Sequence, residues 1–350
     1  MKNNNITNWF KERIPNPLKE YFQNFTIPQH KHSFWYYLGG FTLMCIVVQV
    51  VTGILLLFYY KPNAEDAYNS IEYIMLVVPF GGTVRSLHFW SANGLMIGLI
   101  IHMFSSFFMK AYRKPREFVW FTGVILLFLT FLFAFTGHVL PWDELAYSSA
   151  QVGLAEIERF PLFGKFISSL LKGGREVSGE SLSRIFSLHT SVLPILTLLI
   201  LIIHLALTKL YGFSKPVGDK ETKESLKYYF AFKYRNTIIW LLGLAVLITL
   251  AVLIPHYSGK AFDLNNIAEA PSGIHPEWYF MFFYQLLRLD TILPGGYILL
   301  GLFFLFLFWL IIPLADRKAN EEKKSKIFPI AGIVILIIII ILTVWGYWEI

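Results

Sequence analysis

Hydrophobic residues follow one another in long runs along this chain, and polar residues gather between the runs. A helix rises about 1.5 Å per residue, so roughly 20 apolar residues cross the ~30 Å hydrocarbon layer of a membrane. The runs that are long enough and nearly free of charge cover residues 34–60, 86–109, 118–140, 185–208, 237–255, 297–315 and 327–348. The pattern therefore predicts an all-α integral membrane protein with seven transmembrane helices.

Composition and charge support the same class. Hydrophobic residues make up 55% of the chain and charged residues 15%, and the formal net charge is +7. The basic residues form no single stripe that would suit nucleic acid; 21 of the 30 Lys and Arg fall before the first run or between runs two and three, four and five, and six and seven. By the positive-inside rule, the N-terminus is expected inside and the C-terminus outside a bacterial cytoplasmic membrane or an equivalent one.

The runs divide the chain into four expected segments. An inner-side N-terminal segment covers 1–33, a four-helix bundle 34–208, an inner-side linker 209–236 and a three-helix C-terminal unit 237–350. The linker is the most hydrophilic connection. The first 33 residues lack a signal-peptide pattern, and a short interfacial helix is expected near residues 6–11. The apolar stretch 280–287 is too short to cross and is expected to lie along the membrane surface.

Four of the nine histidines fall inside two predicted spans. His88 and His102 are fourteen residues apart, which places them on one helix face about 21 Å apart. His189 and His204 are fifteen apart, an offset of about 100° that Pro194 can relieve by kinking or locally unwinding the helix. One such histidine is commonly an interhelical hydrogen bond. Two pairs together predict two bis-histidine haem sites, stacked along the membrane normal within the four-helix bundle.

Glycines repeat the same spacing on the two other spans of the bundle. Gly39 and Gly53 are fourteen residues apart, as are Gly123 and Gly137. A flat macrocycle between four helices needs close backbone approach on the helices that do not ligate it, and glycine allows that approach. Ordinary small-residue packing explains one such pair, whereas its repetition favours the haem interpretation.

Basic residues stand where haem propionates need cations. Arg85 and Arg184 lie at the outer ends of the second and fourth spans, shortly before His88 and His189. Three more follow the second span at the inner end: Arg113, Lys114 and Arg116. Those three are equally explained as topology signals.

Several motifs together resemble the cytochrome b subunit of Rieske/cytochrome b quinol oxidoreductases over nearly the whole chain. They are RSLH at 85–88, KPRE at 114–117, LPWD at 140–143, RIFSLHT at 184–190 and PEWY at 276–279. The resemblance implies that His88 pairs with His189 at the outer, lower-potential haem, and His102 with His204 at the inner, higher-potential haem. The histidine spacing in the fourth span and the run 36–45 resemble the photosynthetic and Gram-positive type. That type is split after the fourth helix, whereas the three-helix partner is fused here.

Departures from the family pattern bear on the cofactors and on the quinol pocket. Relatives with an extra covalent haem attach it through a cysteine where this chain has Tyr37. The single cysteine, Cys45, lies eight residues further on and faces elsewhere, so no covalent c-type haem is expected and Cys45 is predicted to be a packed core thiol. His138 stands where a tyrosine is usual, and Ser148 where a tryptophan is usual.

Glu277 in the PEWY motif is the candidate proton acceptor for quinol, because a desolvated carboxylate with a raised pKa can take a proton. The alternative is a charge that satisfies amides at the start of a helix after Pro276. By resemblance, Tyr279, Tyr284 and Tyr147 are candidate pocket residues. His138 is either a second proton relay or a packed ring.

The resemblance implies bifurcated quinol oxidation at the outer face. One electron goes to a Rieske iron–sulfur protein and on to a c-type cytochrome subunit or soluble acceptor, and the other crosses both haems to reduce quinone at the inner face. Homodimerisation of the complex and proton translocation are implied with it. The rival interpretations are a diheme quinone oxidoreductase that feeds a multihaem cytochrome c without a Rieske protein, and a transporter whose histidines relay protons.

Overall fold

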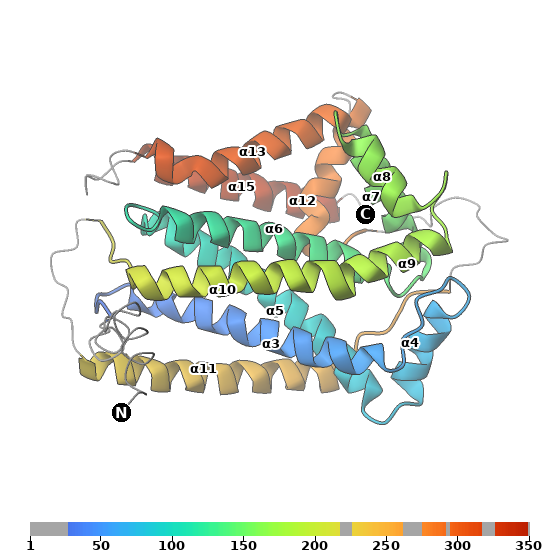
Figure 1. Cartoon of the computed structure of the whole chain (residues 1–350), viewed down its shortest axis with the longest axis horizontal. Coiled ribbons are helices and arrows are strands. Elements are labelled where there is room, and N and C mark those ends of the chain that lie inside the picture. The colour runs from blue at the N-terminus through green and yellow to red at the C-terminus, as the bar shows by residue number, and fades with distance from the viewer. Residues whose placement is uncertain (1–26, 218–225, 262–274, 292–294, 317–325, 349–350) are drawn as a thin grey trace, which may run out of the picture.

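The computed structural model describes residues 27–217, 226–261, 275–291, 295–316 and 326–348. In these ranges the regular secondary structure is entirely helical. Figure 1 shows long helices lying side by side, with shorter helices gathered at one end of the bundle. The short helix expected near residues 6–11 falls outside the described residues.

Within the described ranges, seven helices are long and apolar enough to cross a membrane, which confirms the predicted number of spans. They are α3 (Tyr37–Leu57), α5 (Gly81–Phe108), α6 (Glu117–Val139), α10 (Leu193–Tyr211), α11 (Leu226–Leu253), α13 (Gly295–Ala315) and α15 (Ile327–Trp348). A 3-10 turn, η1 (Ser33–Tyr36), leads into α3, and α9 (Gly179–Ser187) continues through the π-helical turn η2 (Leu188–Val192) into α10. Apolar side chains such as Leu198, Ile202 and Val246 are more than half exposed, as expected of surfaces that meet lipid.

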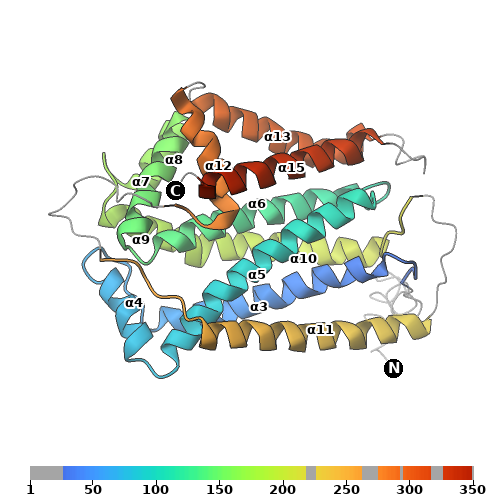
Figure 2. The ribbon, with the colours of Figure 1, turned by 180° about the vertical axis from the view of Figure 1, so that it is seen from behind.

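The bundle is built from two close pairs of spans, because α3 packs along α5 and α6 along α10. The three C-terminal spans contact it from two sides. The helix α11 packs on α3 and α5, while α13 packs on α6, and Figures 1 and 2 both show α11 and the pair α13 and α15 at opposite edges of the molecule. The four-helix bundle therefore lies between C-terminal helices on both sides.

Shorter helices mark one end of the bundle, called here the α7 end. They are α4 (Ala67–Leu76), α7 (Glu144–Arg159) and α8 (Gly164–Lys172), together with α12 (Trp278–Leu287), which crosses the direction of the spans in Figure 1. Asp143 starts α7 by accepting a hydrogen bond from the Ala146 amide at 2.8 Å, and its other carboxylate oxygen accepts from the Gly259 amide at 2.8 Å. That second bond ties the segment after α11 to the start of α7.

Candidate functional site

A cavity of about 950 Å³ runs through the four-helix bundle. All four intramembrane histidines and all four paired glycines line it. His88 and His102 come from α5, His189 from η2 and His204 from α10. The fourteen-residue spacings thus bring His88, His102 and the four glycines to one internal space, as the helical period predicted.

Each of the four paired glycines faces one imidazole ring. A Cβ atom added at the glycine would stand 2.9 to 3.4 Å from the Cε1 atom of that ring. The pairs are Gly39 with His102 (3.4 Å), Gly53 with His88 (3.4 Å), Gly123 with His204 (3.2 Å) and Gly137 with His189 (2.9 Å). The glycines therefore leave room for the histidine rings themselves.

Three of the four histidines make a hydrogen bond from Nδ1 to a threonine hydroxyl on the facing helix. The pairs are Thr52 with His88 (2.8 Å), Thr122 with His204 (2.9 Å) and Thr136 with His189 (2.9 Å). Each hydroxyl also lies 2.7 to 2.9 Å from the carbonyl oxygen four residues earlier in its own helix. Since a hydroxyl has a single proton, which goes to that carbonyl, its oxygen accepts from the imidazole Nδ1–H. The lone pair of each ring then lies on Nε2, the form that binds a metal.

The π-helical turn η2 explains how two histidines fifteen residues apart come to lie on the same helix face. The turn holds His189 and ends just before Pro194, which has no N–H and whose ring would clash with the carbonyl four residues earlier in an ideal helix. A π-helical turn accommodates one extra residue. His189 and His204 therefore share a face, and the expected local unwinding near Pro194 is confirmed.

The cavity and its donors fit two haem groups. His88 lies close enough to His189, and His102 to His204, for a proton gained by one ring to act on the other ring of the pair. Three of these rings are fixed in the tautomer that a metal needs, and the four glycines keep both facing helices free of side chains at the level of each ring. This donor set, two imidazoles at each of two levels, suits an iron atom whose other ligands come from a macrocycle.

One of the two arginines expected at the α7 end lines the cavity. Arg85 is buried, and its guanidinium donates to the carbonyl of His256 and to Ser258 Oγ. Arg184 is exposed and donates to the carbonyl of Leu170 in α8. The face of α9 that carries Arg184 is turned toward α8, so the structure does not bring this residue to the cavity.

At the opposite end, Arg116 lines the cavity and donates to the carbonyls of Tyr211 and Gly212. Arg113 is buried and donates to Ser214 Oγ at 3.0 Å, whereas Lys114 is exposed. Of the three basic residues that follow the second span, Arg116 is the one that the structure brings to the cavity.

Three of the candidate quinol-pocket residues line the α7 end of the cavity: Glu277, Tyr279 and His138. Glu277 is the residue at the start of α12, but its carboxylate makes no capping hydrogen bond there. Burial raises the pKa of Glu277, while the charge of His275 acts in the opposite direction. The geometry thus gives no support to the reading of Glu277 as a helix cap.

The other two tyrosines lie away from that space. Tyr147 is buried beside Trp142, and its hydroxyl donates to the carbonyl of Val177 at 3.3 Å. Neither Tyr147 nor Tyr284 is among the residues that line the cavity.

His256 is a cavity residue that the sequence analysis missed. It stacks on Phe89 with ring centroids 3.6 Å apart and planes 2° from parallel, and its carbonyl receives Arg85. Burial, then the charges of Arg85 and His138, lower the pKa of His256 to about 4, so this ring is neutral at pH 7. A signal was available, because His256 closely follows the fifth apolar run at the membrane level of Arg85.

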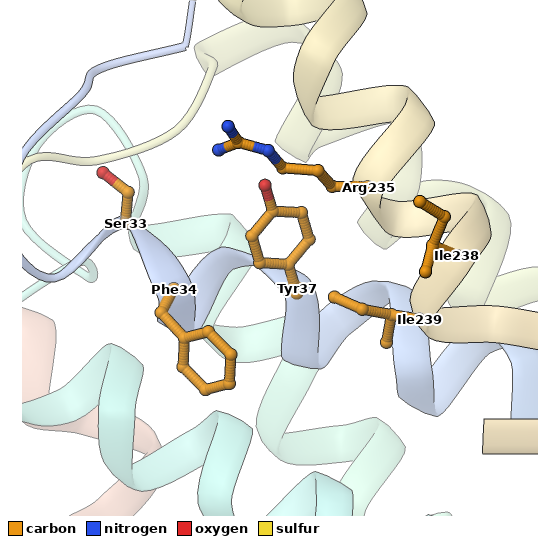
Figure 3. A pocket seen from close by; sticks show the side chains of 6 residues that line it. All are labelled: Ser33, Phe34, Tyr37, Arg235, Ile238 and Ile239. Carbon is orange, nitrogen blue, oxygen red and sulfur yellow. The ribbon is translucent and has the colours of Figure 1, made fainter. Parts of the chain in front are cut away.

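Tyr37 lines a separate pocket of about 440 Å³ at the end opposite α7. Figure 3 shows its ring between η1 and α11, with its hydroxyl directed toward the side of Arg235. The ring stacks on Phe232, with centroids 4.6 Å apart and planes 18° from parallel. Cys45 is fully buried in a cluster with Met44 and Leu95, which confirms it as a packed core thiol.

Comparisons with known families match both parts of the chain. Residues 23–212 match the family described as "Cytochrome b/b6/petB", and residues 264–349 match the family described as "Cytochrome b(C-terminal)/b6/petD". The first match alone covers more than half of the chain. The two matches lie in one polypeptide, in agreement with the fused form expected from the sequence.

Individual relatives give the same picture. The chain is 45% identical to a "Cytochrome bc complex cytochrome b subunit" of Chlorobaculum thiosulfatiphilum, over 99% of this chain and 82% of the relative. It is 38% identical to a "Cytochrome b6" of Acaryochloris marina, over 61% of this chain and 99% of that protein. Among solved structures, a chain of a "Hyperthermophilic respiratory Complex III" superposes with a TM-score of 0.79 and 26% identity, covering 97% of this chain and 91% of that one.

Proposed function

Since this chain belongs to the cytochrome b/b6 family and is the cytochrome b subunit of a bc-type quinol oxidoreductase complex in a membrane, we propose that it holds two b-type haems and carries electrons between two quinone sites. The observation that carries the proposal is the single cavity in which four imidazoles face four glycines. Bound there, the haems supply a one-electron path along the membrane normal.

The ligand pairs of the proposal are His88 with His189 near the α7 end, and His102 with His204 near the opposite end. The proximity of the members within each pair supports this assignment. Arg85 and Arg116 are the cations proposed to face the propionates, since each lines the cavity at one end.

Quinol oxidation is proposed at the α7 end, where Glu277, Tyr279 and His138 line the cavity. Glu277 takes a proton from quinol, because burial raises its pKa toward the pH at which a base exchanges protons efficiently. The neutral ring of His256 places a second imidazole in this region, next to His138. Tyr147 and Tyr284 act on the pocket from outside the cavity.

The distribution of Lys and Arg supports an orientation in which the α7 end is the outer face, with the N-terminus inside and the C-terminus outside. Protons then leave at the outer face and are taken up at the inner face where quinone is reduced, so that charge is separated. The high-potential electron acceptor is a separate Rieske iron–sulfur subunit, which passes its electron to a c-type cytochrome or soluble acceptor. The complex is proposed to form a homodimer.

The test is the substitution His189→Ala in the complete complex. This variant should insert into the membrane and hold one haem per chain in place of two, with quinol oxidation lost. Retention of both haems in His189→Ala would contradict the ligand assignment. The matched control is His138→Ala, which alters another histidine of the same cavity and should keep both haems.

A further inference from the structure

Threonine directly precedes three of the four glycines that face the imidazoles. The dipeptides are Thr52-Gly53, Thr122-Gly123 and Thr136-Gly137, whereas the fourth glycine follows a leucine, in Leu38-Gly39. Each of the three threonines accepts from the histidine that its glycine faces. Leucine has no acceptor to offer at the fourth position.

His102, the histidine that faces Gly39, shows the consequence. Its Nδ1 atom is buried and makes no hydrogen bond with any other described residue. His204 at the same level bonds to Thr122. At the other level, His88 and His189 both bond to threonines. The outer level therefore has two supported imidazoles, and the inner level has one.

An acceptor on Nδ1–H makes an imidazole a more basic ligand through Nε2. A more basic axial ligand stabilises the oxidised metal over the reduced metal and so lowers its reduction potential. The arginines do not by themselves give the two levels different reduction potentials, since one lines the cavity at each end, Arg85 and Arg116. Among the described side chains, the two levels differ at the histidines themselves in one respect: His102 lacks the threonine to which each of the other three histidines bonds.

We propose that Leu38 and the three threonines are positioning residues that set the outer haem below the inner haem in potential. This inference rests on the proposed function, because it assumes that the four histidines are the axial ligands. An electron then moves downhill from the outer level to the inner level, away from the site of quinol oxidation. The sequence signature is a Thr-Gly pair at three of the four positions and Leu-Gly at the fourth.

The test changes the acceptors in both directions within the complete complex. Thr136→Val and Thr52→Val remove an outer acceptor at nearly constant volume, and Thr136→Ser keeps the hydroxyl. Leu38→Thr adds an acceptor beside His102. The matched control is Thr130→Val, because Thr130 lines the same cavity on α6 and bonds only to the carbonyl of Leu126 among the described residues.

Two readouts separate this inference from the proposed function. A pyridine haemochrome assay counts haems, and a redox titration followed in the visible haem bands gives the two potentials. Each Thr→Val change should raise the outer potential, and Leu38→Thr should lower the inner one. The expected shift is about tenfold in the electron-transfer equilibrium between the levels, which is about 59 mV for one electron. Thr136→Ser and Thr130→Val should titrate like the unaltered protein.

Unchanged potentials in Thr136→Val, Thr52→Val and Leu38→Thr, with two haems present, would overturn the inference and leave the proposed function intact. If Thr136→Val loses the outer haem, Leu38→Thr decides the question through the inner haem alone. An unaltered complex without two haems per chain would instead contradict the proposed function.

Discussion

Substitution of Gly137 by alanine tests the contact between glycine and imidazole most severely. A Cβ atom there would stand 2.9 Å from Cε1 of His189, whereas ordinary carbon contacts begin near 3.5 Å. The ring must move by roughly 0.6 Å or more to relieve the contact. Phe133 packs edge-on against this ring with centroids 5.4 Å apart, and Thr136 holds Nδ1 at 2.9 Å. Movement therefore disturbs a packed neighbour and weakens a hydrogen bond.

The magnitude follows from these two effects. Overpacking costs about 1–3 kcal/mol and loss of the hydrogen bond about 0.5–1.5 kcal/mol. A total of about 1.5–4.5 kcal/mol corresponds to haem binding at His189 weakened roughly 10- to 1,600-fold. The assay is the haem content of the purified complex as free haem is removed by a competing haem-binding protein.

Alanine substitution of two further glycines should weaken haem binding less or not at all. Gly53→Ala places Cβ at 3.4 Å from Cε1 of His88, at the lower edge of ordinary contact distances, and should weaken haem binding only a few-fold. Gly301→Ala is the matched control, since among the described residues no atom outside the helix's own nearby backbone lies within 4 Å of a Cβ at that position of α13. Equal haem retention in Gly137→Ala and Gly301→Ala would refute the reasoning.

Three further changes have defined outcomes. Glu277→Gln should lower kcat/KM for quinol about 10²-fold and abolish the acid limb of its pH profile. In the unaltered enzyme this limb should lie above the usual pKa of glutamate, because burial favours the protonated carboxyl group. An unchanged pH profile would contradict the proton role of Glu277. Asp316→Ala should lower the free energy of unfolding by about 3–5 kcal/mol, seen as a lower Tm, because it leaves the buried Lys110 ammonium, 2.7 Å away, without its carboxylate partner. Replacement of both residues by leucine should cost less stability. An equal loss in the two variants would contradict this cause. Trp278→Phe removes the 2.8 Å hydrogen bond from Trp278 to Asn93 that ties α12 to α5, and should raise the KM for quinol with less effect on haem content. Loss of haem without a change in KM would contradict this prediction.

The parts of the site that lie on single helices were predictable from the sequence. His88 and His102 share a face because fourteen residues make nearly four turns, and the same spacing aligns Gly123 and Gly137. The purpose of the glycines was only partly foreseen. The sequence suggested close approach of a macrocycle, whereas in the structure each glycine gives room to a particular imidazole.

Residues whose role depends on loop packing were harder to place. Arg184 precedes His189 by five residues, yet α9 turns its side chain toward α8 and away from the cavity. His256 lies far from the other cavity residues along the chain and reaches them because α11 packs against α5. Spacing within a helix carries no information about such contacts between distant segments.

The threonines were visible in the sequence and were not used. Thr52, Thr122 and Thr136 each precede a glycine that the spacing argument had already selected. Their meaning depends on which helices face one another, because a threonine hydroxyl that bonds within its own helix gives no sequence signal of a second partner. Knowledge that α3 packs on α5 and α6 on α10 supplies that missing step.

The most direct measurement is the number of b-type haems per chain in the purified complex, obtained from the pyridine haemochrome spectrum and the protein concentration. Four histidines arranged at two levels of one cavity predict two haems per chain, falling to one when His204 is replaced by alanine. A complex that contains no haem after expression with ample haem supply, or that keeps two haems without His204, would contradict the assignment of these imidazoles to iron.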